Sequence, residues 1–189
     1  MTVDAKAALF IMLGQAAERT VAKLEDIVPQ DSLFLSPSYD LAPIVPDKVR
    51  RAAEAAEIYK LFFVFEGYLR EFVVEVLSKD GTETTWWDKV PNDVQVDVTR
   101  LEETEESKGW MALGSRDKSA LLTLPQLLKL IEHNWKDSFS EPMRDKSLIH
   151  EARLLVHLRN TICHMSGIST EEADRVRQTM RDWFRVVAP

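Results

Sequence analysis

The longest uninterrupted helical pattern in the chain is "DKVRRAAEAAEIYKLFFVFEGYLREFVVEVLSK", residues 47–79. It contains no proline, and Gly67 is its only weak point. Apolar residues recur at helical spacing and form a stripe along one face, namely Ile58, Phe62, Phe65, Leu69, Val73 and Val76. The pattern stops at Asp80-Gly81. We therefore predict a helix of about nine turns, beginning at Pro46, as the spine of the domain.

Outward from this spine, other segments show the same helical recurrence of apolar residues. They are Asp4 to about Val28, a helix starting at Thr123 with Pro125 just inside it, Asp145 to about His164 ended by Gly167, and a last helix capped by Ser169 and Glu172. Residues 82–120 indicate a connection with one short helix near Val94 to Glu105, and no strand pattern is evident. The predicted fold is all-α, a four-helix bundle over residues 46–189 preceded by an N-terminal helix and Pro-rich linker over residues 1–45.

The composition excludes several classes of protein. With 189 residues, 45% of them hydrophobic, the chain suits one compact core. The single cysteine, Cys163, excludes an intramolecular disulfide framework, and we expect neither a metal nor a cofactor. The lone cysteine suits a protein of the reducing cytoplasm, and no apolar run approaches the length that a membrane span requires. The net charge of −7 disfavours a broad basic surface for nucleic acid but allows a local phosphate site.

Two charged residues interrupt the apolar stripes. Glu66 falls inside the stripe of the spine, and Arg159 falls in the middle of the stripe of the helix that ends near His164. An unpaired buried ion is costly, so we predict that Glu66 and Arg159 meet across the bundle. By residue type alone, such a pair is more often structural than catalytic. The opposite face of the same helix, predicted to meet solvent or a partner, carries His150, Arg153, His157, Asn160 and His164.

The segment "RNTICH", residues 159–164, resembles the RxxxxH signature of HEPN domains, in which a polar residue often follows the arginine. Other segments are similar to the Swt1-like group of that superfamily. These are "FEGYLREFV" at 65–73, "TWWDKVP" at 85–91 and "LLTLPQLLKLIEHNWKDSF" at 121–139. The resemblance extends over roughly Pro46 to Val187 and leaves the N-terminal helix unexplained.

The resemblance implies a four-helix bundle that is commonly a homodimer. It further implies a metal-independent endoribonuclease acting in toxin–antitoxin, phage-defence or RNA-processing systems, with Arg159, Asn160 and His164 as catalytic residues. The chemistry suits these side chains, because histidine transfers protons near neutral pH and arginine matches phosphate oxygens. Such an enzyme leaves a 2′,3′-cyclic phosphate and a 5′-hydroxyl. A regulatory protein such as an antitoxin is the expected partner besides RNA.

Further residues are candidates for supporting roles. Glu66 would anchor the arginine, and His157 lies on the same helix face as His164, although a solvated residue is the simpler interpretation. Arg153 and Arg70 are candidate RNA contacts, but exposed arginines are usually only solvated. The adjacent tryptophans at 86 and 87 would either stack bases or, more commonly, close the end of a bundle.

One geometric difficulty concerns Arg159 and His164, which are about 140° apart around an ideal helix. Either the helix loosens before Gly167, or the same segment of a second subunit completes the site. The alternative function is that of a non-catalytic HEPN-like module that dimerises and binds a protein or nucleotide. A third and simpler interpretation is an all-α dimerisation domain. The N-terminal helix would swap between subunits, cover the bundle or dock an antitoxin, since its apolar stripe needs a surface to bury.

Overall fold

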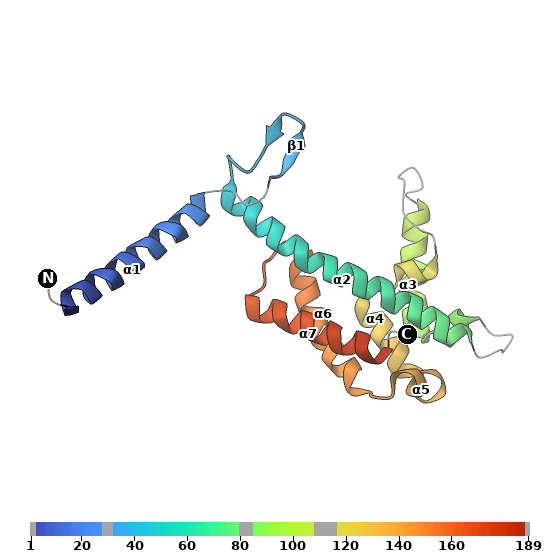
Figure 1. Cartoon of the computed structure of the whole chain (residues 1–189). Helices are drawn as coiled ribbons and strands as arrows, with labels where there is room; N and C mark the ends of the chain where they lie inside the picture. Colours follow the sequence, from blue (N-terminus) through green and yellow to red (C-terminus); the bar gives the residue numbers. More distant parts are fainter. Residues whose placement is uncertain (1–2, 28–31, 80–84, 108–116, 188–189) are drawn as a thin grey trace. The chain divides into compact units, whose positions relative to one another are not determined.

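The structure is a computed structural model that describes residues 3–27, 32–79, 85–107 and 117–187. The chain divides into two units, Met1–Ala56 and Glu57–Pro189, so the division falls inside the longest helix rather than at its start. Apart from one short hairpin and irregular connections, the described residues are helical, and the protein is all-α as predicted. The elements of Figure 1 are α1 (Val3–Ile27), β1 (Phe34–Ser36), β2 (Tyr39–Asp40), α2 (Pro46–Ser78), η1 (Trp86–Lys89), α3 (Asn92–Ser107), η2 (Lys118–Leu121), α4 (Leu124–His133), η3 (Trp135–Phe139), α5 (Ser140–Met143), α6 (Ser147–Cys163) and α7 (Thr170–Val187).

The spine α2 is the predicted long helix, and it continues through Gly67 without a break. Its side chains buried in the bundle are Ile58, Phe62, Phe65, Leu69, Val73 and Leu77. The sequence pattern placed Val76 in this stripe, but Val76 is only half-buried and Leu77 takes its place. Each step of four residues rotates a helical stripe by about 40°. The buried face therefore slants around α2 instead of running parallel to its axis.

Aromatic rings join α2 to α7. The rings of Phe65 and Trp183 meet edge to face with centroids 5.5 Å apart, and those of Tyr68 and Phe184 are 4.9 Å apart. The Tyr68 hydroxyl donates a hydrogen bond of 2.9 Å to the carbonyl oxygen of Val187. Edge-to-face pairs add to the stabilisation from buried area. These contacts attach the C-terminal turn of α7 to the spine, which Figure 1 shows running beside it.

Helix α6 packs against both α4 and α7 within the bundle. The start of α7 is fixed by the capping box predicted from the sequence. The Ser169 Oγ accepts from the Glu172 backbone N–H at 3.2 Å, and the Glu172 carboxylate accepts from the Ser169 backbone N–H at 2.8 Å. These hydrogen bonds hold the pKa of Glu172 below its usual value. The capping box thereby fixes the point at which the short turn after α6 ends and α7 begins.

The connection between α2 and α4 is more helical than expected. Its helix α3 covers Asn92–Ser107, longer than the short segment near Val94 to Glu105 that the pattern indicated. Arg70 of α2 fixes the far end of the connection by donating from Nε to the Ser119 carbonyl at 2.7 Å. Asn134, buried after α4, donates to the Lys89 carbonyl at 3.1 Å and so fixes the near end.

The N-terminal unit contains α1 and a hairpin that the sequence pattern missed. The segment expected to be an extended linker instead pairs β1 with β2 in an antiparallel register, and its residues 28–31 lie outside the described ranges. The Asp40 carboxylate closes the hairpin by accepting from the backbone N–H groups of Leu33 and Ala42, each at 3.0 Å. Strands this short have no measurable alternation of apolar residues. Within the part of the chain that the structure covers, no helix is long and apolar enough to cross a membrane.

We predict that Phe65→Ala lowers the free energy of unfolding by about 3–5 kcal/mol, because it empties a fully buried site against Trp183. The matched control is Phe63→Ala on the same helix, where the side chain is 70% exposed. That variant should change stability by no more than about 0.5 kcal/mol. Urea denaturation followed by circular dichroism measures both. Similar losses for the two variants would contradict the packing described here.

Candidate functional site

Helix α6 separates its buried and exposed side chains as the sequence pattern predicted. Leu148, Ile149, Ala152, Leu155, Leu158 and Ile162 are buried. The predicted polar face is exposed along its whole length, at His150, Arg153, His157, Asn160 and His164. Asn160 and His164 are four residues apart and therefore share a side of the helix end. Two of the three predicted catalytic side chains thus lie together in solvent.

The predicted ion pair between Glu66 and Arg159 is present. The Arg159 Nε donates to Glu66 Oε1 at 2.6 Å, and Nη2 donates to Oε2 at 3.4 Å, so the contact uses one edge of the guanidinium. The Glu66 side chain is 13% exposed, and the Arg159 side chain is 29% exposed. The hydrogen bonds to Glu66 hold the pKa of Arg159 above its usual value, although partial burial acts in the opposite direction. Among the described residues, Nη1 has no hydrogen-bond partner.

The end of α6 has a defined hydrogen-bond geometry. The His164 N–H donates to the Asn160 carbonyl at 2.9 Å, which is the ordinary helical bond. The Met165 N–H then donates to the Ile162 carbonyl, and the Ser166 N–H to the Thr161 carbonyl. This pair of bonds is a Schellman motif, in which the residue after the C-cap is left-handed and is usually glycine. Here that residue is Met165, with φ 60° and a side chain that is 93% exposed.

The helix terminus differs from the expected one. The pattern placed the helix end at about His164 with Gly167 as its terminator; α6 does end at Cys163, but Met165 rather than Gly167 takes the left-handed conformation. The sequence could not reveal this, because a methionine at that position is sterically disfavoured. The helix stays regular through Cys163, and the His164 N–H still makes the helical bond to the Asn160 carbonyl, although His164 itself is the C-cap residue. Loosening of the helix therefore does not bring Arg159 round to His164.

The other predicted site residues have identified neighbours. Arg153 forms an ion pair with Glu132, and Arg70 donates to the carbonyls of Ser119 and Leu122. The pKa of Glu172, lowered mainly by the hydrogen bonds from Ser169, is lowered further by the nearby charges of Arg175 and His157. Both candidate RNA contacts thus also support the fold.

The two tryptophans lie in η1 at the start of the connection. Their rings meet edge to face with centroids 5.4 Å apart, and neither is fully buried. Lys118 Nζ lies 4.7 Å from the centroid of Trp87. An occupied ring face is not available to a base, so Trp87 is engaged within the protein.

A small cavity of about 90 Å³ lies beside the ion pair of Glu66 and Arg159. Tyr59 and Phe63, one turn apart on α2, line it together with Arg70 and Cys163. Their rings are 6.4 Å apart, and the side chains are 50% and 70% exposed. Sequence reasoning missed these two residues, although an aromatic pair four residues apart outside the apolar stripe was a visible signal.

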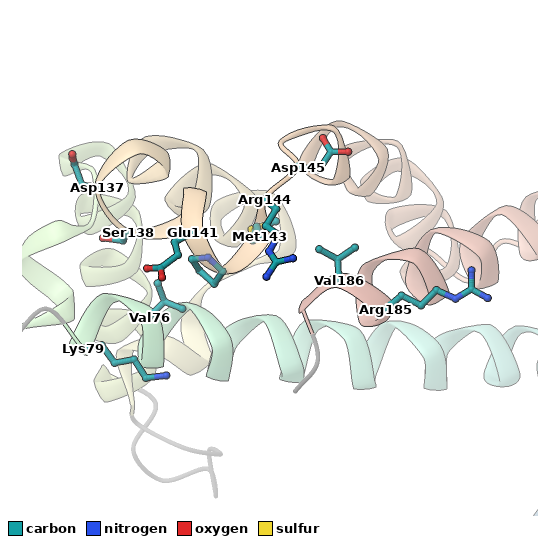
Figure 2. Close-up of a pocket in the computed structure, with 11 residues that line it drawn as sticks. Val76, Lys79, Asp137, Ser138, Glu141, Met143, Arg144, Asp145, Arg185 and Val186 are labelled. Atoms are coloured by element: carbon teal, nitrogen blue, oxygen red, sulfur yellow. The ribbon is translucent and has the colours of Figure 1, made fainter.

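A larger cavity of about 810 Å³, shown in Figure 2, lies among α2, η3, α5 and α7. None of the predicted catalytic residues lines it, and no histidine does. Its charges balance, because Lys79, Arg144 and Arg185 are opposed by Asp137, Glu141 and Asp145. We assign no site to this cavity. Among the residues that the structure describes, no group of His, Cys, Asp or Glu side chains is arranged to hold a metal ion.

Comparison with known protein families identifies the domain. The model of the Swt1-like HEPN family matches residues 60–188, which is more than half of the chain. The matched region contains α3 to α7, most of α2, the ion pair and the "RNTICH" segment. The chain therefore belongs to the Swt1-like HEPN family and contains a HEPN module. Comparisons with curated proteins and with solved structures gave no significant match.

We predict that Glu66→Ala lowers the free energy of unfolding by about 1–3 kcal/mol, because it leaves the partly buried Arg159 without its acceptor. Glu57→Ala is the matched control, since Glu57 pairs with Lys60 on the same helix but is 66% exposed. The control should lose no more than about 0.5 kcal/mol. Chemical denaturation measures the free energy of unfolding of both variants. Equal losses would show that the partly buried ion pair stabilises the fold no more than the exposed one.

We also predict that Met165→Gly raises the free energy of unfolding by about 0.5–1 kcal/mol, because glycine adopts the left-handed conformation without strain. Gly167→Ala, where no positive φ is required, should be neutral or slightly stabilising. Thermal unfolding of both variants tests this assignment. A loss of stability in Met165→Gly, together with a loss in Gly167→Ala, would instead restore Gly167 as the terminator.

Proposed function

We propose that this protein is a metal-independent endoribonuclease with Arg159, Asn160 and His164 as its catalytic residues. The observation that carries the proposal is the division of labour at the end of α6. His164 and Asn160 are exposed on one side, while the guanidinium of Arg159 is held on the other by Glu66. A histidine with no structural task among the described residues, together with an arginine that is held in place, supplies the groups that proton transfer at a phosphate requires.

The reaction uses the RNA's own nucleophile. A base removes the proton from a 2′-hydroxyl, and the 2′-oxygen attacks the adjacent phosphorus. The bond from phosphorus to the 5′-oxygen breaks, and an acid protonates that oxygen as it leaves. Histidine serves as base or acid near neutral pH, and arginine stabilises the charge on the phosphate oxygens. Asn160 orients the imidazole or the phosphate. The products are a 2′,3′-cyclic phosphate and a 5′-hydroxyl.

We propose that the active form is a homodimer in which each site takes residues from both subunits. Support comes from the regular end of α6, because Arg159 and His164 diverge by about 140° on an intact helix. A two-fold axis at this end would bring His164 of one chain toward Arg159 of the other. It would also supply two histidines, one for each proton transfer. The alternative second imidazole within one chain is His157.

The biological role that suits such an enzyme is a cytoplasmic one in toxin, antiphage-defence or RNA-processing systems. A ribonuclease of this kind needs restraint, so a regulatory protein such as an antitoxin is the proposed partner besides RNA. The apolar residues of α1, including Phe10 at 79% exposure, offer an apolar surface in the N-terminal unit. Exposed apolar surface of this kind often marks a protein contact.

The alternative is a non-catalytic HEPN module for dimerisation and for binding a protein or nucleotide. Two observations favour it. The chain carries a net charge of −7, and Arg153, one of the two candidate RNA contacts, is paired with the Glu132 carboxylate. Both observations reduce the basic surface available for RNA.

We predict that His164→Ala lowers RNA cleavage by at least about a hundredfold, as expected for loss of a general acid or base. The substitution is at an exposed position, so folding and dimerisation should be unchanged. His150→Ala, on the same exposed face but at the start of α6, is the matched control and should cleave normally. Cleavage of labelled RNA in excess chelator, with analysis of the 3′ ends, measures the effect.

The outcomes separate the two functions. Cleavage by the wild type that leaves 2′,3′-cyclic phosphate ends and disappears only in His164→Ala supports the enzyme. No cleavage by either protein on structured or unstructured RNA favours the binding module. Loss of cleavage in both histidine variants would point to a general effect of the exposed face.

A further inference from the structure

We infer that Tyr59 and Phe63 form a stacking shelf for an unpaired base, next to the phosphate-binding arginine. The inference rests on the proposed function for its ligand, a single strand of RNA. It adds the requirement that the bound nucleotide be unpaired. The shelf is defined as the two rings on α2 that line the small cavity with Arg159 and Arg70.

Both rings are exposed to solvent. An exposed large apolar side chain alone needs no explanation, but here two aromatic rings lie side by side over one cavity. The core of α2 does not use them, because the buried stripe runs through Phe62 and Phe65 instead. Base stacking on exposed aromatic rings is a common way to hold single-stranded nucleic acid, and it tolerates any base.

The charged residues that line the cavity favour an anion. Two arginines and one glutamate line the cavity, so it carries a net positive charge although the whole chain is acidic. Arg70 bonds only to backbone carbonyls, and among the described residues it has no carboxylate partner. Arg159 donates to Glu66 from one edge of its guanidinium, and Nη1 has no partner among the described residues. The site therefore offers donors and positive charge to an anion.

The two rings and the two arginines lie around the same cavity. A nucleotide presents a flat apolar base and a phosphate a short distance away, which matches two rings beside two arginines. A purely apolar partner surface fits less well, because it would cover Arg159 Nη1 and leave a donor unsatisfied. A base inside a duplex cannot stack on a protein ring without leaving its partner. The shelf thus selects single-stranded over double-stranded RNA.

The test measures binding apart from cleavage. The probe is a fluorescein-labelled 12-nucleotide RNA carrying 2′-O-methyl groups throughout, which removes the nucleophile, and the same strand annealed to its complement. Full-length wild type should bind the single strand more tightly than the duplex. Phe63→Leu keeps an apolar side chain but removes the ring, and it should weaken single-strand binding about tenfold, while Phe63→Trp should bind at least as well as the wild type.

Controls keep the shelf separate from folding, association and catalysis. Val64→Ala changes a neighbouring side chain that is 60% exposed and does not line the cavity, so its affinity should equal that of the wild type. His150→Ala, at an exposed position outside the proposed catalytic residues, should also bind the probe normally. Sedimentation analysis reports whether Phe63→Leu alters the oligomeric state, as it would if a second copy of the chain covered the rings.

The results overturn the shelf and the nuclease independently. Unchanged affinity in Phe63→Leu, equal binding of single strand and duplex, or no binding by the wild type would each overturn the shelf. So would a variant that changes association but not RNA affinity. If the shelf binds RNA but no RNA is ever cleaved, the inference stands and the proposed nuclease fails. If RNA is cleaved and Phe63→Leu leaves KM and affinity unchanged, the nuclease stands and the shelf fails.

Discussion

The ion pair between Glu66 and Arg159 links the bundle's packing to its candidate chemistry. It joins α2 to α6 at a place where both helices otherwise present apolar side chains. Because the pair is partly open to solvent, its desolvation cost is lower than that of a fully buried pair. The contact fixes one edge of the guanidinium and leaves the remaining nitrogen available. A structural salt bridge and a positioned phosphate ligand are therefore compatible in one residue.

The helices and the ion pair could be predicted from the sequence because they follow from local periodicity and from the cost of an unpaired buried charge. Glu66 and Arg159 each interrupt an apolar stripe, and neither charge is stable there without the other. The capping residues indicate where helices begin. The hairpin at β1 and β2 was missed because its strands are too short to alternate. Met165 was missed because its left-handed backbone depends on the Schellman bonds rather than on residue preference.

The segments that resemble the Swt1-like group prove to have structural tasks. Arg70 and Asn134 hold the two ends of the connection to the spine and to the end of α4. Trp87 packs under Lys118. Such residues define the fold by which the family is identified, while the exposed side chains of Asn160 and His164 have no comparable task in the part of the chain that the structure describes. The catalytic proposal rests on that contrast between engaged and exposed residues.

The central claim is that Arg159 of one chain acts with His164 of another, and a mixed-dimer experiment tests it most directly. Arg159→Lys, which keeps the charge opposite Glu66 but loses the planar fork, and His164→Ala are each prepared as inactive proteins. They are then mixed under conditions that allow subunits to exchange. A shared site predicts that RNA cleavage returns in part, because one site of each mixed dimer has both native residues while the dimer keeps only one His164. Mixed dimers that form but stay inactive would contradict it.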